Sequence, residues 1–106
     1  MKETDINITL QYFDGCPNWK ETDAHLQSLQ SEGLDLNVTY QLIETPEAAA
    51  VAGFRGSPTV VIDGVDPFAD SEAPVGLACR VYRTDDGYAG SPSRQQLRDA
   101  ITATSG

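Results

Sequence analysis

Close to its N-terminus, the chain changes from a strand pattern to a helix pattern at Cys16 and Pro17. The preceding residues alternate between apolar and polar side chains from Ile6 to Tyr12, which is the periodicity of a β-strand. Proline is favoured in the first turn of a helix, where its missing N–H costs nothing. Apolar residues then recur at helical spacing as far as Gly33, which predicts a helix from Pro17 onward. The chain therefore carries a cysteine at a strand-to-helix junction.

The rest of the pattern predicts further helices and strands. A second apolar alternation covers residues 34–42, and the β-branched run Thr59–Ile62 is typical of a strand covered on both faces. A right-handed crossover through the first helix makes the first two strands parallel. We expect residues 1–106 to form a single α/β domain of three layers, a mixed sheet of about four strands flanked by three helices. The other expected segments are a short helix at 45–53, a loop at 64–76, a strand at 76–83, a turn region at 84–90 and a final helix after 91–93.

The charge of the chain narrows its possible partners. Its formal net charge is -9, and its 7 basic residues are scattered. Binding to nucleic acid or to an anionic membrane needs clustered Lys and Arg, so neither partner is expected. No apolar run approaches the ~18 residues of a membrane span, and no signal-peptide pattern is present. We expect a cytoplasmic monomer whose two cysteines are reactive or buried, not a permanent structural disulfide.

Two short motifs carry a resemblance to a known family. Cys16-Pro17 occupies the first strand-to-helix junction, and Ser57-Pro58-Thr59 precedes the third strand. In this order the motifs resemble those of the thioredoxin fold over nearly the whole chain. The chain is similar to small bacterial glutaredoxin- and thioredoxin-like proteins, with Cys-Pro-x-Trp in place of the usual Cys-x-x-Cys because Trp19 replaces the second cysteine.

The resemblance implies a thioredoxin-like three-layer fold and roles for individual residues. Cys16 would be the attacking thiol and Pro58 a cis-proline that lines the substrate groove, while the backbone of Ser57 would pair with an extended peptide. The substrate would be a disulfide-containing protein or a low-molecular-weight thiol, and no cofactor is implied. The residues expected to bind this substrate are Pro17, Trp19, Ser57, Pro58 and Thr59.

The chemistry of the junction also favours a reactive Cys16. At a helix N-terminus, unpaired backbone N–H groups and the helix dipole stabilise a thiolate. Lys20 assists weakly one turn further on, whereas Asp14 opposes the negative charge. The simpler interpretation is a small apolar residue buried at a helix start. The presence of Pro17 and Pro58 favours the reactive role.

Two layouts remain open for Cys79. If residues 76–83 pair directly with Thr59–Ile62, Cys79 lies mid-strand, on the order of 10 Å from Cys16 at the strand rise per residue. No disulfide then forms, because the Cα atoms of paired cysteines lie within ~7 Å. Alternatively, Gly64 makes a tight turn into a short strand at 65–68, and the returning chain brings Cys79 to Cys16 as the resolving thiol. The strand layout, with Cys79 as a buried structural cysteine, is slightly favoured.

Trp19 and His25 each have a structural and a functional interpretation. Trp19 is either a core anchor of the first helix or a flat wall beside the thiol that binds substrate. His25 is the only histidine and lies about 13 Å from Cys16 by helical rise, which is too far for direct proton transfer. We expect His25 to be a solvated residue on the helix surface.

Neither the acidic residues nor the cysteines match a metal-binding pattern. The acidic stretch after the third strand lacks the alternating ligands and closing glutamate of an EF-hand loop, so it predicts an exposed acidic loop. Two distant cysteines and one histidine give no zinc pattern, and no metal site is expected. The acidic stretch consists of Asp63, Asp66, Asp70 and Glu72.

Three functions are consistent with these features. The first is a thiol-disulfide oxidoreductase in which Cys16 attacks and Cys79 or an external thiol releases the product. The second is a non-enzymatic binding or scaffold domain of the same fold, with a vestigial Cys16. The third is a thiol protein that captures a soft metal such as Hg(II) or Cu(I). Cys16-Pro17 and Ser57-Pro58 favour the enzyme, whereas Trp19 favours the other two.

Overall fold

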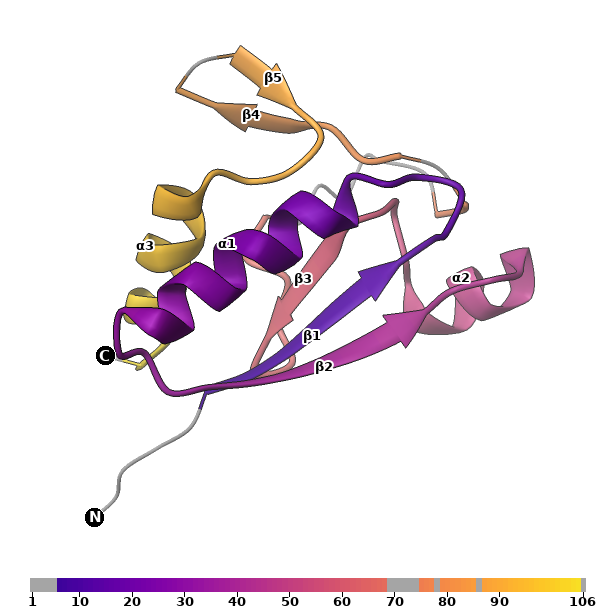
Figure 1. Ribbon diagram of the computed structural model, residues 1–106. Coiled ribbons are helices and arrows are strands. Elements are labelled where there is room, and N and C mark those ends of the chain that lie inside the picture. Colours follow the sequence, from indigo (N-terminus) through magenta and orange to yellow (C-terminus); the bar gives the residue numbers. More distant parts are fainter. Residues whose placement is uncertain (1–5, 69–74, 78, 86, 106) are drawn as a thin grey trace.

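The computed structural model describes residues 6–68, 75–77, 79–85 and 87–105 and has a mixed α/β architecture (Figure 1). These residues form three helices, a three-stranded sheet and a small two-stranded sheet, which confirms the α/β class. Within them, no helix is both long enough and apolar enough to cross a membrane. The elements are β1 (Ile6–Tyr12), α1 (Trp19–Ser31), β2 (Leu36–Leu42), α2 (Pro46–Ala52), β3 (Thr59–Ile62), β4 (Tyr82–Thr84), β5 (Gly87–Ala89) and α3 (Arg94–Ser105).

β1 is the central strand of the larger sheet, which has the order β2-β1-β3. It runs parallel to β2, with Ile6 opposite Leu36, and antiparallel to β3, with Ile8 opposite Ile62. The parallel pairing follows from the helical connection between β1 and β2, as expected for such a crossover. The mixed sheet and the parallel first pair are therefore confirmed.

α1 and α3 cover one face of this sheet (Figure 1). The buried side of β1 meets fully buried leucines of α1 and the apolar stripe of α3. A short hydrogen bond between the hydroxyl groups of Thr22 and Ser91, 2.7 Å long, joins α1 to the segment that precedes α3. The resulting core contains Ile6, Ile8, Leu10, Leu26, Leu29, Val60, Ile62, Leu97 and Ile101.

The opposite face of the sheet is polar over most of its length. Like residues of β1 and β2 lie opposite each other there: Asn7 and Asn37, Thr9 and Thr39, and Gln11 and Gln41. Hydrogen bonds of 3.0 Å and 2.9 Å join the two amide pairs. Because such residues need no apolar cover, a helix is not required on this face.

α2 has its own small core at one end of the sheet. It is a short helix capped by the side chain of Thr45, which accepts a hydrogen bond from the Ala48 N–H at 3.0 Å. Ala49 packs with Ile43 and Phe54, which lie just beyond β2 and before β3. The expected three layers are therefore not continuous, because α2 covers only this end while α1 and α3 cover the sheet itself.

The expected strand at 76–83 is wrong, and so is the count of about four strands in one sheet. Among the described residues of this region only Tyr82–Thr84 is a strand, and it pairs with β5 in a separate hairpin instead of with β3. This hairpin occupies the predicted turn region at 84–90. Part of the predicted strand (Ala78) and part of the turn (Asp86) lie outside the described residues.

A tight turn after β3 directs the chain away from the sheet. Asp63 and Gly64 both have positive φ angles, of 48° and 88°, as a type I′ turn requires. Ile62 and Val65 exchange two backbone hydrogen bonds across it, of 2.7 Å and 3.0 Å. The tight turn expected at Gly64 is confirmed, although Val65 forms only an isolated bridge and not a strand.

Replacing Leu97 with alanine should lower the free energy of unfolding by about 2–5 kcal/mol, because the deletion leaves a cavity in the main core. The control is Val51→Ala, since Val51 lies on α2 with 91% of its surface exposed. This variant should change stability by less than about 0.5 kcal/mol. Urea unfolding of the oxidised proteins measures both values. Equal losses in the two variants would contradict the placement of Leu97 between α3 and the sheet.

Candidate functional site

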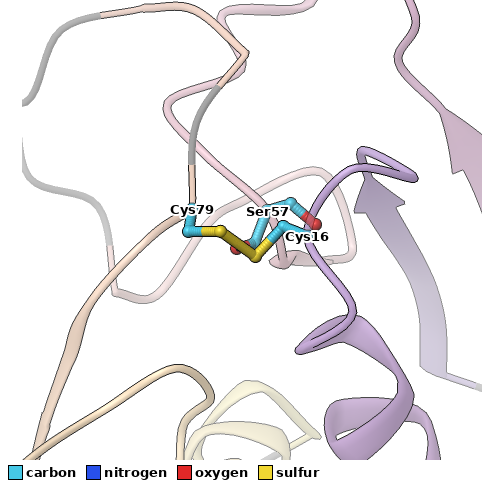
Figure 2. Close-up of a disulfide and its surroundings, with 3 residues drawn as sticks. All are labelled: Cys16, Ser57 and Cys79. Carbon is cyan, nitrogen blue, oxygen red and sulfur yellow. A yellow bond between two sulfur atoms is a disulfide. The ribbon is translucent and has the colours of Figure 1, made fainter.

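A disulfide joins Cys16 to Cys79 across 63 positions of the chain (Figure 2). The two Cα atoms are 5.7 Å apart, within the range of ordinary disulfides. The layout that left Cys79 unpaired in a strand beside β3 is therefore wrong. After the turn at Gly64 no further strand of the described residues joins β3, and Cys79 pairs with Ser57 in an isolated bridge instead.

Cys16 is completely buried in the loop that leads into α1. Its N–H donates to the Phe13 carbonyl oxygen at 3.0 Å, which closes a turn at the end of β1. Pro17 is exposed, and its carbonyl oxygen accepts a hydrogen bond from Lys20 N–H at 3.1 Å. Helical hydrogen bonding thus begins immediately after the cysteine, although α1 itself starts at Trp19. The helix predicted from Pro17 onward therefore begins at Trp19 instead, and Cys16 lies in the turn that leads into it.

Ser57 and Pro58 form the opposite wall of the site. The Ser57-Pro58 peptide bond is cis, as expected, and both residues are buried. The Sγ atom of Cys16 lies 3.8 Å from the Ser57 carbonyl oxygen, so the two predicted motifs are in contact. Thr59 is also buried, and its hydroxyl donates to the Gly56 carbonyl oxygen at 2.7 Å.

The Ser57 hydroxyl has an unusual environment. Among the described side chains, its Oγ is a buried polar atom without a hydrogen-bond partner. A buried hydroxyl left unpaired is unfavourable by roughly 1–3 kcal/mol. Ser57 lies directly beside the disulfide in Figure 2. The Ser57 atom that lies 3.8 Å from Cys16 Sγ is its carbonyl oxygen.

Cys79, unlike Cys16, is exposed. It forms an isolated parallel bridge with Ser57, in which the Arg80 N–H donates to the Ser57 carbonyl oxygen at 2.9 Å. This backbone pairing takes the place that the thioredoxin resemblance assigns to an extended peptide substrate. The chain's own segment thus pairs with the backbone of Ser57, and Cys79 is the exposed member of the disulfide.

Arg80 and Tyr82 complete the site, and sequence reasoning missed both. The Arg80 guanidinium forms an ion pair with Asp66 at 2.7 Å, and the Tyr82 hydroxyl donates to the Pro58 carbonyl oxygen at 2.5 Å. Exposed and buried residues alternate from Cys79 to Tyr82, which produced the strand-like pattern in the sequence. The burial of Arg80 was not predicted, because arginine is seldom inside a protein unless it is paired.

Trp19 belongs partly to the core. It packs against the main cluster, and its ring centroid is 4.5 Å from that of Tyr12. The core interpretation of Trp19 is confirmed, while a role in substrate binding stays a prediction. His25 is half-buried, pairs with Glu21 at 3.5 Å and lines a cavity of about 280 Å³ between α1, the β4–β5 hairpin and the start of α3.

The acidic stretch has structural partners instead of a ligand geometry. Asp63 accepts a hydrogen bond from the Asn7 N–H at 2.9 Å, and Asp66 pairs with Arg80. Asp70 and Glu72 lie outside the described residues. Within the described part of the chain, no group of three or more His, Cys, Asp or Glu side chains is placed to hold a metal ion.

No protein-family model matches this sequence, and a search of curated proteins finds no match either. The function must therefore be inferred from the chemistry of the site.

Replacing Gly56 with alanine should disturb the site more than the same change at Gly64. Both glycines have positive φ angles, of 124° and 88°, so both variants share a backbone penalty. A Cβ at Gly56 would also lie 2.9 Å from Arg80 Cβ, whereas nothing lies within 4 Å of a Cβ at Gly64. We expect Gly56→Ala to lose about 1–3 kcal/mol more stability in urea unfolding. Equal losses would contradict the close packing of Arg80 on this loop.

Stability should fall at high pH because of Tyr82. Burial raises the pKa of this phenol well above its usual value, and the smaller opposing effect of the Arg80 cation does not cancel it. The unfolded chain then loses its proton first, so this contribution is complete below about pH 10 and decreases as the pH rises further. Tyr82→Phe should reduce the decline of unfolding free energy above pH 10, measured with urea. An identical decline in wild type and variant would contradict this origin.

Proposed function

We propose that this protein is a thiol-disulfide oxidoreductase of the thioredoxin-like class, with Cys16 and Cys79 as its redox pair. The observation that carries the proposal is the disulfide between a buried cysteine at a helix start and an exposed cysteine. A disulfide with one exposed cysteine is suited to exchange, because a thiolate must reach a sulfur atom to react. A purely structural bond has no need of this asymmetry.

The exchange begins at Cys79, because Cys16 is 0% exposed. A substrate thiolate attacks Cys79 Sγ and forms a mixed disulfide, while the Cys16–Cys79 bond breaks and Cys16 leaves as a thiolate. A second substrate thiolate then attacks the substrate sulfur of the mixed disulfide and releases Cys79. The substrate gains one disulfide, and the two electrons it loses reduce the protein to the dithiol. In the opposite direction, the dithiol reduces a substrate disulfide through the same mixed disulfide.

This scheme exchanges the roles that the resemblance implies. In the resemblance, Cys16 attacks the substrate and Cys79 resolves the mixed disulfide. In the proposed scheme, Cys79 reacts with the substrate and the buried Cys16 resolves the mixed disulfide. Cys16 is the leaving thiolate, and it lies just before the N-terminal end of α1, where the helix dipole favours negative charge. A stabilised leaving thiolate accelerates the attack on the sulfur to which it is bonded.

The substrate class follows from the surface around Cys79. The Ser57 edge is already paired with the chain itself, so the substrate approaches the sulfur from solvent. Val81, two residues from Cys79, is an apolar side chain with 66% of its surface exposed. An accessible cysteine or disulfide on a protein surface, or a low-molecular-weight thiol, meets these requirements.

Capture of a soft metal is a second candidate for the reduced protein. Two thiolates whose Cα atoms lie 5.7 Å apart suit Hg(II) or Cu(I), which prefer sulfur ligands. A third alternative, a binding domain without thiol chemistry, uses neither cysteine. These candidates predict different results for single cysteine substitutions.

The test is catalysed reduction of glutathione disulfide with dithiothreitol as electron donor. Cys16→Ser and Cys79→Ser should each lower the catalysed rate at least tenfold. Cys16→Ser should accumulate a mixed disulfide on Cys79, detected by mass spectrometry, because its resolving thiol is gone. Cys79→Ser should form such an adduct much more slowly, since Cys16 is buried.

Each alternative has its own signature in this experiment. Unchanged turnover in both variants would favour the third alternative, a binding domain without thiol chemistry. Absent turnover in the wild type, combined with Hg(II) binding that needs both cysteines, would favour metal capture. Faster adduct formation on Cys16 than on Cys79 would restore the roles implied by the resemblance.

A further inference from the structure

Arg80 directly follows the exposed Cys79, yet its own side chain is buried. Its guanidinium donates to Asp66 Oδ2 at 2.7 Å, to Thr59 Oγ1 at 3.2 Å and to the Phe68 carbonyl oxygen. The same group lies 4.7 Å from the ring centroid of Tyr82. A buried cation is stable when it is paired and its donors are satisfied, and these contacts meet that condition.

The backbone of Arg80 is held equally closely. Its N–H donates to the Ser57 carbonyl oxygen, the same atom that lies 3.8 Å from Cys16 Sγ. On the other side, the Cα of Gly56 faces it so closely that an added Cβ would lie 3.2 Å from the Arg80 backbone nitrogen. The residue next to Cys79 is therefore fixed against the loop that contacts Cys16.

None of these contacts uses the sulfur-sulfur bond. Reduction of the disulfide removes a covalent link without removing any atom that makes the ion pair, the hydrogen bonds or the packing of Arg80. Without them, the segment that carries Cys79 would be free to leave the Ser57 loop, and closing the disulfide again would cost chain entropy. With them, the two thiols remain neighbours and react as an intramolecular pair.

We propose that Arg80 and Asp66 form a clamp that keeps Cys79 beside Cys16 in the dithiol form and so sets the reduction potential of the pair. The clamp makes oxidation to the disulfide more favourable, because it raises the effective concentration of one thiol near the other. Arg80 and Asp66 are positioning residues, since they act through Cys79. This role of the clamp rests on the proposed oxidoreductase function only for the biological use of the redox pair.

The test is the equilibrium of the full chain with glutathione. In this reaction the protein dithiol and one glutathione disulfide give the protein disulfide and two glutathione thiols, with two electrons passing to glutathione. Arg80→Met keeps much of the length of the side chain but removes its charge and donors. We expect it to lower the equilibrium constant for disulfide formation at least tenfold, which raises the potential by about 30 mV.

Two further variants make this result specific. Arg83→Met is the matched control, because Arg83 is exposed three residues along from Arg80 and should stay within threefold of wild type. Arg80→Lys keeps the charge but not the planar fork of donors and should fall between wild type and Arg80→Met. An equilibrium constant for folded Arg80→Met within threefold of wild type would overturn the clamp.

Amide hydrogen exchange provides a second measurement, which does not depend on Arg80→Met being folded. In reduced wild-type protein the Arg80 N–H should exchange at least tenfold more slowly than in reduced Asp66→Asn, because the clamp preserves its bond to Ser57. Exchange at the unprotected rate in the reduced wild type would overturn the proposal. Neither measurement uses substrate turnover, so a failed clamp and a failed oxidoreductase assignment give different results.

Discussion

Buried carbonyl groups in the loop before β3 need hydrogen-bond donors, and the segment after Cys79 supplies two of them. The Ser57 carbonyl oxygen accepts from the Arg80 N–H, and the Pro58 carbonyl oxygen accepts from the Tyr82 hydroxyl. Buried backbone groups are almost always paired, so this loop and this segment stabilise each other. Their association brings Cys79 to the start of α1, and the disulfide follows from it.

The same association explains why the site has one closed side and one open side. Cys16 lies between the start of α1 and the Ser57 loop, where solvent does not reach it. Cys79 is exposed to solvent, on the segment that pairs with the Ser57 loop. Inward-pointing Arg80 and Tyr82 hold this segment, which leaves the alternate residues Cys79 and Val81 at the surface. Side chains of an extended backbone point alternately to opposite sides, so Cys79 is exposed because Arg80 and Tyr82 point inward.

Local sequence predicted those parts of the fold that local interactions determine. β1 and α1 have clear periodicity, β3 is an unbroken β-branched run, and the Cys16 and Pro58 motifs lie next to these elements as predicted. The route of the chain after β3 depends instead on a pairing that no periodicity encodes. Residues 79–82 do alternate as an extended segment, but their partner is the Ser57 loop and not β3. The disulfide and the Arg80–Asp66 pair could not be predicted, because both depend on where the chain returns.

The polar face of the sheet has a consequence for how the strands find their alignment. A slip of β2 by one residue would turn its apolar side chains away from the core, so burial alone excludes it. A slip by two residues keeps every side chain on its own face, so the alternation of apolar and polar residues does not exclude it. Such a slip would set asparagine against threonine and threonine against glutamine, breaking the amide pairs of Asn7 with Asn37 and Gln11 with Gln41. The paired polar side chains therefore favour the native alignment in addition to the burial of the core.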